Sequence, residues 1–417
     1  MGRRRGALDL MTYDLLLRSV RVWGGGVADV AIGAGRIAAL REPGSDLAAN
    51  QIVDASGALA LPGLVDAHAH LDKTLWGMPW HSHGAGPTVL DRIENERRVL
   101  RELGSSPARQ SARLVRHMIA RGTTHVRTHV DVGPEMGLAH LRGVMATRET
   151  YREWIDMQIV AFPQTGVMRE PGTVELLDAA IGEGADLLGG LDPAGIDGDA
   201  AGQLDALFAI AARRGCGIDI HLHERGEQGA RTVDMVCERT GALGLAGRVA
   251  ISHAFCLGML EPQRLERLIE RLRRLDIAIM THAPSGYTPF PPVRLLASRG
   301  VRLFTGSDGV RDAWAPLNTG DMLERAYLIA YNSGFRDDAG IELALRMATF
   351  GGARELGARN YGLDVGSTAD LVLVDADNAA EAVCAHPPRR LVIKRGRVVA
   401  RDGRIAMSGP EPESLAD

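Results

Sequence analysis

Short apolar runs separated by turn residues mark both ends of the chain. Between residue 12 and about residue 62 these runs are DLLLRSVRVW, VADVAIG, GRIAAL and QIVDASGALALPG, and from about residue 363 they are ADLVLVDAD and RRLVIKRGRVVARDGR. Such runs are typical of β-strands, and the last one predicts a hairpin around Lys394-Arg395-Gly396-Arg397. We therefore predict a small β-sandwich domain built from both chain ends. The GGG and GAGR segments are better explained as hairpin turns than as a phosphate loop, because no helix with GK[ST] follows them.

The middle of the chain alternates strand-like and helix-like segments. Amphipathic stretches with apolar residues at i, i+3 and i+4, such as SARLVRHMIARG and AGQLDALFAIAARRG, separate apolar runs of strand length. Eight such alternations predict a (β/α)8 TIM barrel of the α/β class. The predicted boundaries are residues 1–62 for the N-terminal part of the β-sandwich, 63–362 for the barrel and 363–417 for the C-terminal part of the β-sandwich. The expected barrel strands are LALPGLVDAHAH, THVRTHVD, MQIVAFPQ, DLLGGLDP, GIDIHLHE, RVAISHA, IAIMTHA and VRLFTGSD.

The composition of the chain argues against several classes of partner. The formal net charge is −4, which gives no electrostatic reason to expect binding to nucleic acid or to an anionic membrane. The sequence has no apolar run of about 18 residues, so we expect no membrane-spanning helix. Met11 is a candidate natural start, which would make residues 1–10 an extension. Isolated cysteines without a CxxC pair argue against a thiolate zinc site or a disulfide framework and suit a cytoplasmic location; they are Cys216, Cys237, Cys256 and Cys384.

Lysine is rare in this chain. Of the 48 lysine and arginine residues, only Lys73 and Lys394 are lysine. Lys73 lies beside the main histidine motif, so a role that specifically requires lysine is one explanation of this bias, and chance is the other.

Histidines and other polar residues gather at the predicted strands. In a (β/α)8 barrel the active site lies at the carboxyl ends of the strands. Glu224, Gln164 and Asp308 lie at such ends, and so do many of the 13 histidines. We expect these groups to converge on one rim, as the polar groups of a catalytic mouth do. The eight histidines within or at the ends of predicted strands are His68, His70, His125, His129, His221, His223, His253 and His282.

A metal site is the chemistry that these residues suggest. His68 and His70 are two residues apart on one strand, so both imidazoles face the same side. His221 on the fifth strand adds a third nitrogen ligand suited to zinc or ferrous iron, and Asp308 on the eighth adds an anionic oxygen. Such an ion lowers the pKa of water to roughly 7. The structural alternatives are paired core histidines and, for Asp308, an N-cap.

Two further features refine this site. His253 ends the sixth strand, where a role in holding the attacking water is favoured over a role as a fifth ligand or as a packed core histidine. Binuclear centres of this type need a bridging group, often a modified lysine at the end of the fourth strand. Here the fourth strand ends in LDP and neither lysine is nearby, so we predict one ion per chain.

The motifs together resemble a known family. HAHLDKT, AFPQTG, HLHE, SHAF and GSDGVRDAWAPLN follow one another on successive predicted strands. In this order they resemble the cytosine deaminase branch of the amidohydrolase superfamily, including the related N-isopropylammelide amidohydrolases. The resemblance covers nearly the full chain and extends to the two-ended β-sandwich. It is specific for the branch and much less specific for the substrate.

The resemblance implies catalytic roles for the motif residues. It implies one zinc or iron ion bound by His68, His70, His221 and Asp308. It also implies that Glu224 is the general acid-base, which protonates a ring nitrogen as hydroxide attacks the adjacent carbon. His253 is implied to position that hydroxide and to stabilise the developing oxyanion.

The resemblance also implies substrate contacts. The carboxamide of Gln164 can pair with an adjacent C=O and N–H of a pyrimidine or triazine. Trp314 is a candidate pocket wall, with ordinary packing as the alternative. Lys73, in HLDK, is similar to the arrangement in the ammelide enzymes. Cytosine deaminases carry a second aspartate after the one that matches Asp308, whereas this chain has Gly309, and we expect the glycine to open space for a bulkier substituent.

These residues predict a hydrolytic deaminase of a small nitrogen heterocycle, which releases ammonia or an amine from a cytosine-like aminopyrimidine or an amino- or alkylamino-triazine. A hydantoinase-like cyclic amide hydrolase is the main alternative, but it would need a binuclear centre with a modified lysine. A non-catalytic scaffold barrel is the other alternative, although all four expected ligands and Glu224 are present. Family habit implies a homo-oligomer.

Overall fold

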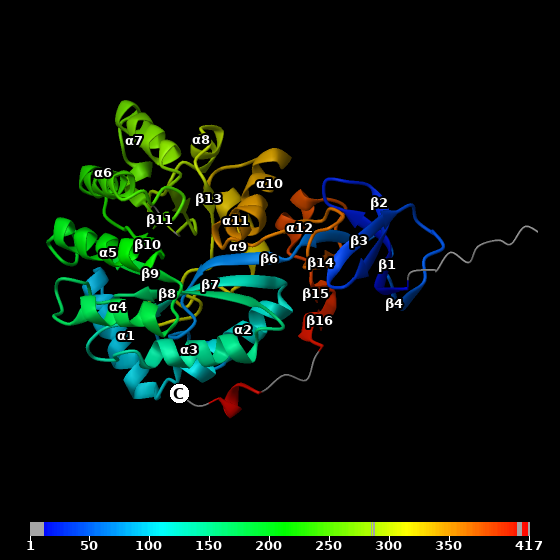
Figure 1. Ribbon diagram of the computed structural model, residues 1–417, viewed down its shortest axis with the longest axis horizontal. Coiled ribbons are helices and arrows are strands. Elements are labelled where there is room, and N and C mark those ends of the chain that lie inside the picture. The colour runs from blue at the N-terminus through cyan, green and yellow to red at the C-terminus, as the bar shows by residue number, and fades with distance from the viewer. Residues whose placement is uncertain (1–11, 285, 287, 407–410, 416–417) are drawn as a thin grey trace, which may run out of the picture.

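A helix-covered barrel and a second sheet make up the structure, a computed structural model that describes residues 12–284, 286, 288–406 and 411–415 (Figure 1). The predicted extension at residues 1–10 lies outside the described residues. Eight strands form a parallel sheet in the order β13-β12-β11-β10-β9-β8-β7-β6, which is the chain order expected for a (β/α)8 barrel. They are β6 (Leu64–Ala69), β7 (Thr123–Asp131), β8 (Asp156–Phe162), β9 (Leu187–Leu191), β10 (Gly217–His221), β11 (Val249–Ser252), β12 (Ala278–Met280) and β13 (Leu303–Phe304).

Contacts between β6 and the chain after β13 close the barrel. The amide N of Asp308 donates to the carbonyl O of His68 at 2.8 Å, and Ala69 forms an isolated parallel bridge with Asp308. Gly306 permits this approach, because a Cβ atom at that position would lie 2.3 Å from the carbonyl O of His68. The closure therefore places Asp308 beside the end of β6.

Helices surround the barrel, and the predicted amphipathic stretches lie in α2, α4, α5 and α7. An apolar core of buried residues fills the space between strands and helices. The α-helices are α1 (Val89–Leu103), α2 (Pro107–Ala120), α3 (Ala139–Thr150), α4 (Thr173–Glu183), α5 (Ala200–Arg214), α6 (Gly226–Ala242), α7 (Pro262–Arg274), α8 (Val293–Ser298), α9 (Met322–Asn332), α10 (Asp338–Arg346), α11 (Gly352–Glu355) and α12 (Ala379–Ala385). Two short 3-10 helices, η1 (Phe255–Gly258) and η3 (Pro412–Ser414), and one π-helix, η2 (Met347–Gly351), complete the helical elements of the described residues.

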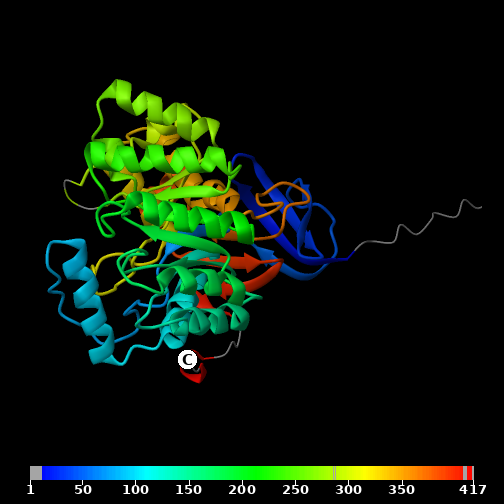
Figure 2. The ribbon, with the colours of Figure 1, turned by 60° about the vertical axis from the view of Figure 1, so that its left-hand side comes forward.

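Helix α1 is an insertion between β6 and α2 that the periodicity analysis did not single out. The helix begins with a capping box, in which the Thr88 hydroxyl accepts from the amide N of Asp91 at 3.1 Å. It ends at Gly104, whose backbone is in the left-handed region. Figures 1 and 2 show α1 on the side of the barrel away from the second sheet.

Strands from both chain ends form the second sheet, as predicted. Its order is β17-β16-β15-β14-β5-β1-β2-β3, and β4 also pairs with β1. The predicted hairpin is present, with Lys394 paired to Arg397 across Arg395 and Gly396. The GGG and GAGR segments are hairpin turns. The strands are β1 (Tyr13–Val22), β2 (Val27–Gly33), β3 (Arg36–Arg41), β4 (Ala49–Asp54), β5 (Leu59–Pro62), β14 (Leu371–Val374), β15 (Arg389–Lys394), β16 (Arg397–Arg401) and β17 (Arg404–Ile405).

The run LALPGLVDAHAH was predicted as one strand and is divided between the two sheets. Its first half is β5 of the second sheet and its second half is β6 of the barrel. The break falls at Gly63, where a Cβ atom would lie 2.3 Å from the Thr124 hydroxyl. Among the described residues, none of the helices has the length and apolarity needed to cross a membrane.

Candidate functional site

Five imidazoles and one carboxylate meet at the carboxyl ends of the barrel strands. The Nε2 atom of His70 lies 3.3 Å from Oδ1 of Asp308 and 3.3 Å from Nε2 of His221. Nitrogen and oxygen ligands about 2.0–2.1 Å from a tetrahedral ion are separated by roughly 3.3 Å, so these spacings suit a shared ion. Two groups have ligand atoms within 4.8 Å of one another: His68, His70, His129 and His221, and His68, His221, His253 and Asp308.

The protonation states of these groups also suit a cation. Burial lowers the pKa of His68, His221 and His253, so that these rings are neutral and keep a lone pair for a ligand. Burial alone would raise the pKa of Asp308, but the surrounding histidines outweigh it and hold the carboxyl ionised. The buried atoms His68 Nε2 and His253 Nε2 have no hydrogen-bond partner among the described residues. Such orphaned nitrogens facing an anion are what a metal ion would satisfy.

A chain of contacts inside the barrel orients His68. Its Nδ1 lies 3.0 Å from the Ser252 hydroxyl, which donates to Oδ1 of Asp219 at 2.6 Å. Because the serine proton goes to the carboxylate, the histidine carries its proton on Nδ1 and leaves the Nε2 lone pair for the site. Arg127 forms a buried ion pair with Asp219, in which NH1 of the arginine lies 2.9 Å from Oδ2 of the aspartate. The ring of His68 is therefore fixed in one tautomer.

Left-handed backbone occurs at several of the strand ends that form the site. Asp192 follows β9 with φ 36°, His253 follows β11 with φ 70°, and Asp308 follows β13 with φ 61°. Such conformations are unfavourable for residues with side chains, and they persist where the surrounding structure imposes them, often at functional sites. The left-handed turn at Asp308 also excludes the N-cap alternative, since the next helix begins at Met322.

Glu224 lies three residues beyond His221 and is held by three donors. Its Oε1 accepts from the amide N of Ala194 at 2.7 Å and of Gly195 at 3.0 Å, and its Oε2 accepts from the Thr232 hydroxyl at 2.5 Å. Burial raises the pKa of this carboxyl, and the three hydrogen bonds offset part of the rise. A pKa displaced toward neutrality suits a group that both accepts and returns a proton.

His253 lies between two further histidines. Its ring stacks on His223 at a centroid distance of 4.4 Å, and its Nδ1 is 3.1 Å from Nδ1 of His282. Burial lowers the pKa of His223, but the adjacent Asp192 carboxylate, 2.9 Å away, outweighs this and raises it. One nitrogen of His253 lies within 4.8 Å of ligand atoms of His68, His221 and Asp308, which is close enough for a metal ligand or for a group that positions water.

A second polar cluster lies beside the histidines. Lys73 Nζ is 2.9 Å from Oδ1 of Asp131 and 3.5 Å from Oε1 of Glu96, and the same Glu96 oxygen accepts from Nε2 of Gln164 at 3.4 Å. Phe162 lies near both groups: Lys73 Nζ is 5.5 Å from the centre of its ring, and the same centre is 4.2 Å from the centre of the His221 ring. Burial raises the pKa of Glu96 to about 8, although Lys73 lowers it.

Trp314 packs beside this cluster. The ring belongs to a small apolar group with Ile93, Phe162 and Leu191, and its buried Nε1 has no partner among the described residues. The guanidinium of Arg92 lies 5.9 Å from the ring centre. The indole is thus near Phe162, with a free donor.

The expectation that Gly309 opens space for a bulkier substituent is wrong. A Cβ atom at residue 309 would lie 1.8 Å from Oδ2 of Asp312, so the carboxylate of Asp312 already fills that space. Its Oδ1 accepts from the amide N of Trp314 at 2.9 Å. In the loop after β13, the carboxylate of Asp312 therefore lies beside the position where cytosine deaminases have their second aspartate.

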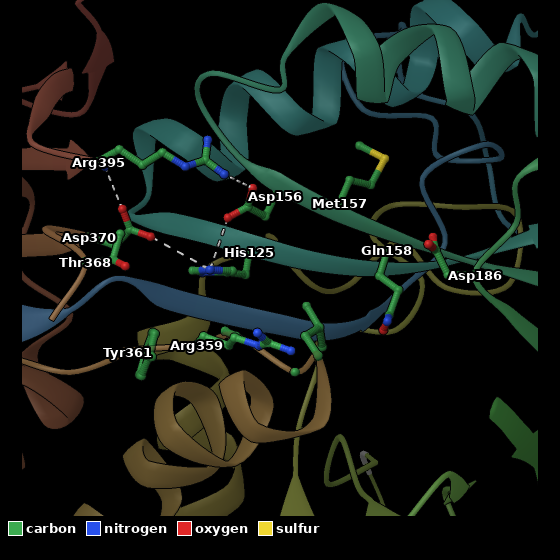
Figure 3. Close-up of a pocket in the computed structure, with 13 residues that line it drawn as sticks. His125, Asp156, Met157, Gln158, Asp186, Arg359, Tyr361, Thr368, Asp370 and Arg395 are labelled. Atoms are coloured by element: carbon green, nitrogen blue, oxygen red, sulfur yellow. Dashed lines mark hydrogen bonds and ion pairs between the residues drawn. The ribbon is translucent and has the colours of Figure 1, made fainter. Parts of the chain in front are cut away.

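The expectation that all eight histidines share one rim is wrong for His125. This residue is near the start of β7, at the opposite end of the barrel, with Nε2 3.3 Å from Asp156 and 3.8 Å from Asp370. It lines a cavity of about 400 Å³ at the junction with the second sheet, which Figure 3 shows together with Arg395 and Tyr361. Lys394 Nζ lies 2.7 Å from both carboxylates, so an internal cation already satisfies them.

Several residues at the site were not assigned a role from the sequence. They are His129, His282, Asp219 and Glu96. The period-two alternation in THVRTHVD places His125, Arg127, His129 and Asp131 on the same face of β7, which is a signal that His129 points into the barrel. The sequence signal for a buried role of Glu96 is weaker: its carboxyl lies at the same spacing as the apolar residues Ile93 and Val99 on one helix.

Comparison with known proteins shows the family of this chain. The model of the amidohydrolase family matches residues 51–400. The crystal structure of N-isopropylammelide isopropylaminohydrolase from Burkholderia multivorans is 48% identical, with a TM-score of 0.91 over 95% of this chain and 100% of that chain. N-isopropylammelide isopropyl amidohydrolase from Pseudomonas sp. (strain ADP) is 30% identical over 361 residues, which are 84% of this chain and 88% of the relative. The structure of 5-methylcytosine deaminase from Klebsiella pneumoniae is 26% identical, with a TM-score of 0.82 over 96% of this chain and 100% of that chain.

The same family was inferred from HAHLDKT, HLHE and GSDGVRDAWAPLN, and the fold and the strand-end histidines agree with it. This chain belongs to the amidohydrolase family.

Proposed function

We propose that the protein is a metal-dependent hydrolytic deaminase of a small nitrogen heterocycle, either a cytosine-like aminopyrimidine or an amino- or alkylamino-triazine. One observation carries the proposal: neutral imidazoles and the Asp308 carboxylate meet at the spacing of metal ligands. One of these imidazoles, His221, lies three residues before Glu224, the buried acid-base candidate. The relatives support the choice of ring, because their names refer to a triazine substrate and a pyrimidine substrate.

The metal is proposed to be one zinc or iron ion per chain, with His68, His70, His221 and Asp308 as its ligands. The fit rests on the orphaned buried nitrogens and on the ionised carboxylate described above. When bound, such an ion lowers the pKa of water to roughly 7 and so supplies a nucleophile near neutral pH. The Ser252–Asp219 pair would keep His68 in the tautomer that a ligand needs.

Glu224 is proposed to move the protons of the reaction. In its ionised form the carboxylate accepts a proton from water and passes it to a ring nitrogen. It then takes the second proton from the hydroxyl group on the attacked carbon and delivers it to the leaving ammonia or amine. The amide groups of Ala194 and Gly195 hold it in place, so the carboxyl does not need to reorganise between these transfers. His253 is proposed to position the attacking water and to stabilise the oxyanion that develops at the attacked carbon.

Gln164, Lys73 and Trp314 are proposed to bind the ring. They lie near Phe162, in a cluster that supplies a carboxamide, an ammonium and an indole N–H. The ammonium and the indole N–H are donors that suit ring carbonyl oxygens, which favours an oxidised pyrimidine or triazine over a fully aminated one. We also propose that the protein forms a homo-oligomer, as the family resemblance implies.

The test is an assay of ammonia and amine release by metal-quantified protein. The panel is cytosine, isocytosine, 5-substituted cytosines, creatinine, ammelide, N-alkylammelides and hydantoins, measured in parallel with a Glu224→Gln variant. We expect release from an aminopyrimidine or aminotriazine, with about one ion per chain and loss of activity in the variant. Turnover of hydantoins alone, or two ions per chain, would contradict the proposal.

A further inference from the structure

Helix α1 covers the barrel mouth and buries a carboxyl on its apolar face. Ile93, Glu96 and Val99 are its buried residues, each three apart, so they share one side of the helix. Asn95 adds an anchor, because its Nδ2 donates to the carbonyl O of Ala313 in the loop after β13 at 3.2 Å. A carboxyl placed among apolar residues is unfavourable unless it has partners. The partners of Glu96 therefore explain its presence there.

The partners of Glu96 are the two proposed readers of the substrate ring. Its Oε1 lies 3.5 Å from Nζ of Lys73 and accepts from Nε2 of Gln164 at 3.4 Å. Among the described residues, Glu96 is the only side chain that forms hydrogen bonds with both. Its other oxygen, Oε2, is buried and has no hydrogen-bond partner among those residues.

These contacts determine which end of the Gln164 amide faces the substrate. Lys73 has only donors, so the Glu96 oxygen beside it stays an acceptor in either protonation state. An acceptor at that point attracts the NH2 group of Gln164 and repels its carbonyl oxygen. The carbonyl oxygen of Gln164 has no partner in the part of the chain that the structure describes, although the residue is only 5% exposed. It is therefore left free to accept from a ring N–H.

We propose that Glu96 is a positioning residue for the reaction, which acts through Gln164 and Lys73 rather than by contact with the ring. It turns the amide oxygen of Gln164 toward the substrate and holds the Lys73 ammonium next to it. A free acceptor beside a free donor matches a ring edge that carries N–H beside C=O, so the site selects the lactam form of the heterocycle. This inference rests on the proposed deaminase function and narrows its substrate class to oxo-substituted rings.

The test compares three substitutions on one helix. Glu96→Leu removes the acceptor and suits the apolar stripe of the helix, whereas Glu96→Gln keeps an acceptor but removes the charge. Glu102→Leu makes the same change as the first variant at an exposed position, where Glu102 pairs with Arg98. Each variant is assayed on an oxo-substituted substrate of the wild-type enzyme and on its O-methyl lactim ether. In the ether the ring N–H becomes an unprotonated nitrogen acceptor.

We expect the wild type and Glu102→Leu to prefer the lactam by roughly 100-fold or more in kcat/KM, because a site built to pair with an N–H rejects a ring that lacks it. In Glu96→Leu the amide of Gln164 is free to flip, so the preference should fall about tenfold or more, while metal content and Tm stay close to those of Glu102→Leu. Glu96→Gln should retain most of the preference.

The outcomes separate this inference from the function on which it rests. If the wild type releases neither ammonia nor amine from any ring of the panel, the proposed function fails. If the wild type is active and Glu96→Leu keeps the full lactam preference, the positioning role of Glu96 is wrong and the deaminase function stands. A loss of preference in Glu96→Gln equal to that in Glu96→Leu would also overturn the argument, since the acceptor would then be irrelevant.

Discussion

The two lysines of the chain lie at opposite ends of the barrel, and each bridges two carboxylates. Lys73 at the mouth lies 2.9 Å from Asp131 and 3.5 Å from Glu96, and Lys394 at the base lies 2.7 Å from both Asp156 and Asp370. Both side chains are almost completely buried. A compact ammonium presents its donors from a single point between the two carboxylates, whereas a guanidinium spreads its donors over a planar fork, as Arg127 does between Asp219 and Glu355.

The surroundings of the two lysines differ in what they leave unsatisfied. Around Lys394, the residues that line the base cavity have no orphaned buried side-chain atom among those described. Around Lys73 and the adjacent histidines, the orphans include Glu96 Oε2, Trp314 Nε1, His68 Nε2 and His253 Nε2. Buried polar groups normally find partners, so a concentration of exceptions indicates a place where a ligand is expected. Two similar ion-pair clusters thus differ: the one at the base joins the barrel to the second sheet, and the one at the mouth lies where we propose that a ligand binds.

The largest effect that this comparison predicts is on catalysis at the mouth. We expect Glu224→Gln to lower kcat by about 10²–10⁴-fold, because the proton transfers lose their acid-base group while its hydrogen-bonding shape is kept. Steady-state kinetics with a substrate found by the panel would measure it. Glu227→Gln is the matched control, since that exposed residue pairs with Arg264 on the surface. A Glu224→Gln variant with the activity of this control would remove Glu224 from the mechanism.

At the base, the prediction concerns stability rather than activity. Lys394→Met leaves Asp156 and Asp370 without their shared cation and should lower the free energy of unfolding by about 3–5 kcal/mol. The kcat of the molecules that remain folded should not change. Denaturant unfolding against Arg397→Met, a change in the exposed neighbouring hairpin, isolates the effect. If Lys394→Met is as stable as this control, the base cluster does not hold the two sheets together.

A smaller effect is expected from the residue that orients His68. Ser252→Ala removes the hydroxyl between His68 and Asp219, so the imidazole loses its fixed tautomer. We expect metal affinity to fall by about 10–100-fold. Competition with a chelator would measure this, with Ser298→Ala as the control at an exposed helical serine. Unchanged affinity in Ser252→Ala would show that the Ser252–Asp219 pair does not support the ligand.

The smallest predicted effect is a pH dependence of stability. Burial raises the pKa of Glu96 from its usual 4.5 to about 8, so the folded protein binds a proton that the unfolded chain releases. The contribution is therefore full below about pH 4.5 and is lost as the pH rises through about 8. We expect Tm to fall by a few degrees more in the wild type than in Glu96→Gln between pH 5 and 8.5, as measured by calorimetry. Parallel pH profiles would contradict the raised pKa.

Much of the fold could be predicted from the sequence, because it depends on local periodicity. The eight strand-like runs and the amphipathic stretches specify a barrel, and HAHLDKT, HLHE and FTGSD place their polar residues at strand ends. The approach of His70 to His221, and of His68 and His70 to Asp308, then follows from the geometry of the barrel.

The rest depends on contacts that periodicity does not contain. The division of LALPGLVDAHAH at Gly63 arises from packing against Thr124, and the space beside Gly309 is filled by a side chain three residues later. His125 has the same inward-facing pattern as His129, but its depth along the strand places it at the base. The role of Glu96 depends on α1 lying over two loops that are distant in the sequence.

The central claim is that the mouth, and not the base, binds one catalytic ion. Both ends of the barrel contain a His/Asp group with metal-like spacing: His68, His221, His253 and Asp308 at the mouth, and His125, Asp156 and Asp370 at the base. The most direct test is metal analysis of purified wild type, Asp308→Asn and Asp156→Asn, each loaded with zinc or ferrous iron and then desalted. We predict about one ion per chain in the wild type and in Asp156→Asn, and almost none in Asp308→Asn. Retention of the ion in Asp308→Asn with its loss in Asp156→Asn would contradict the account.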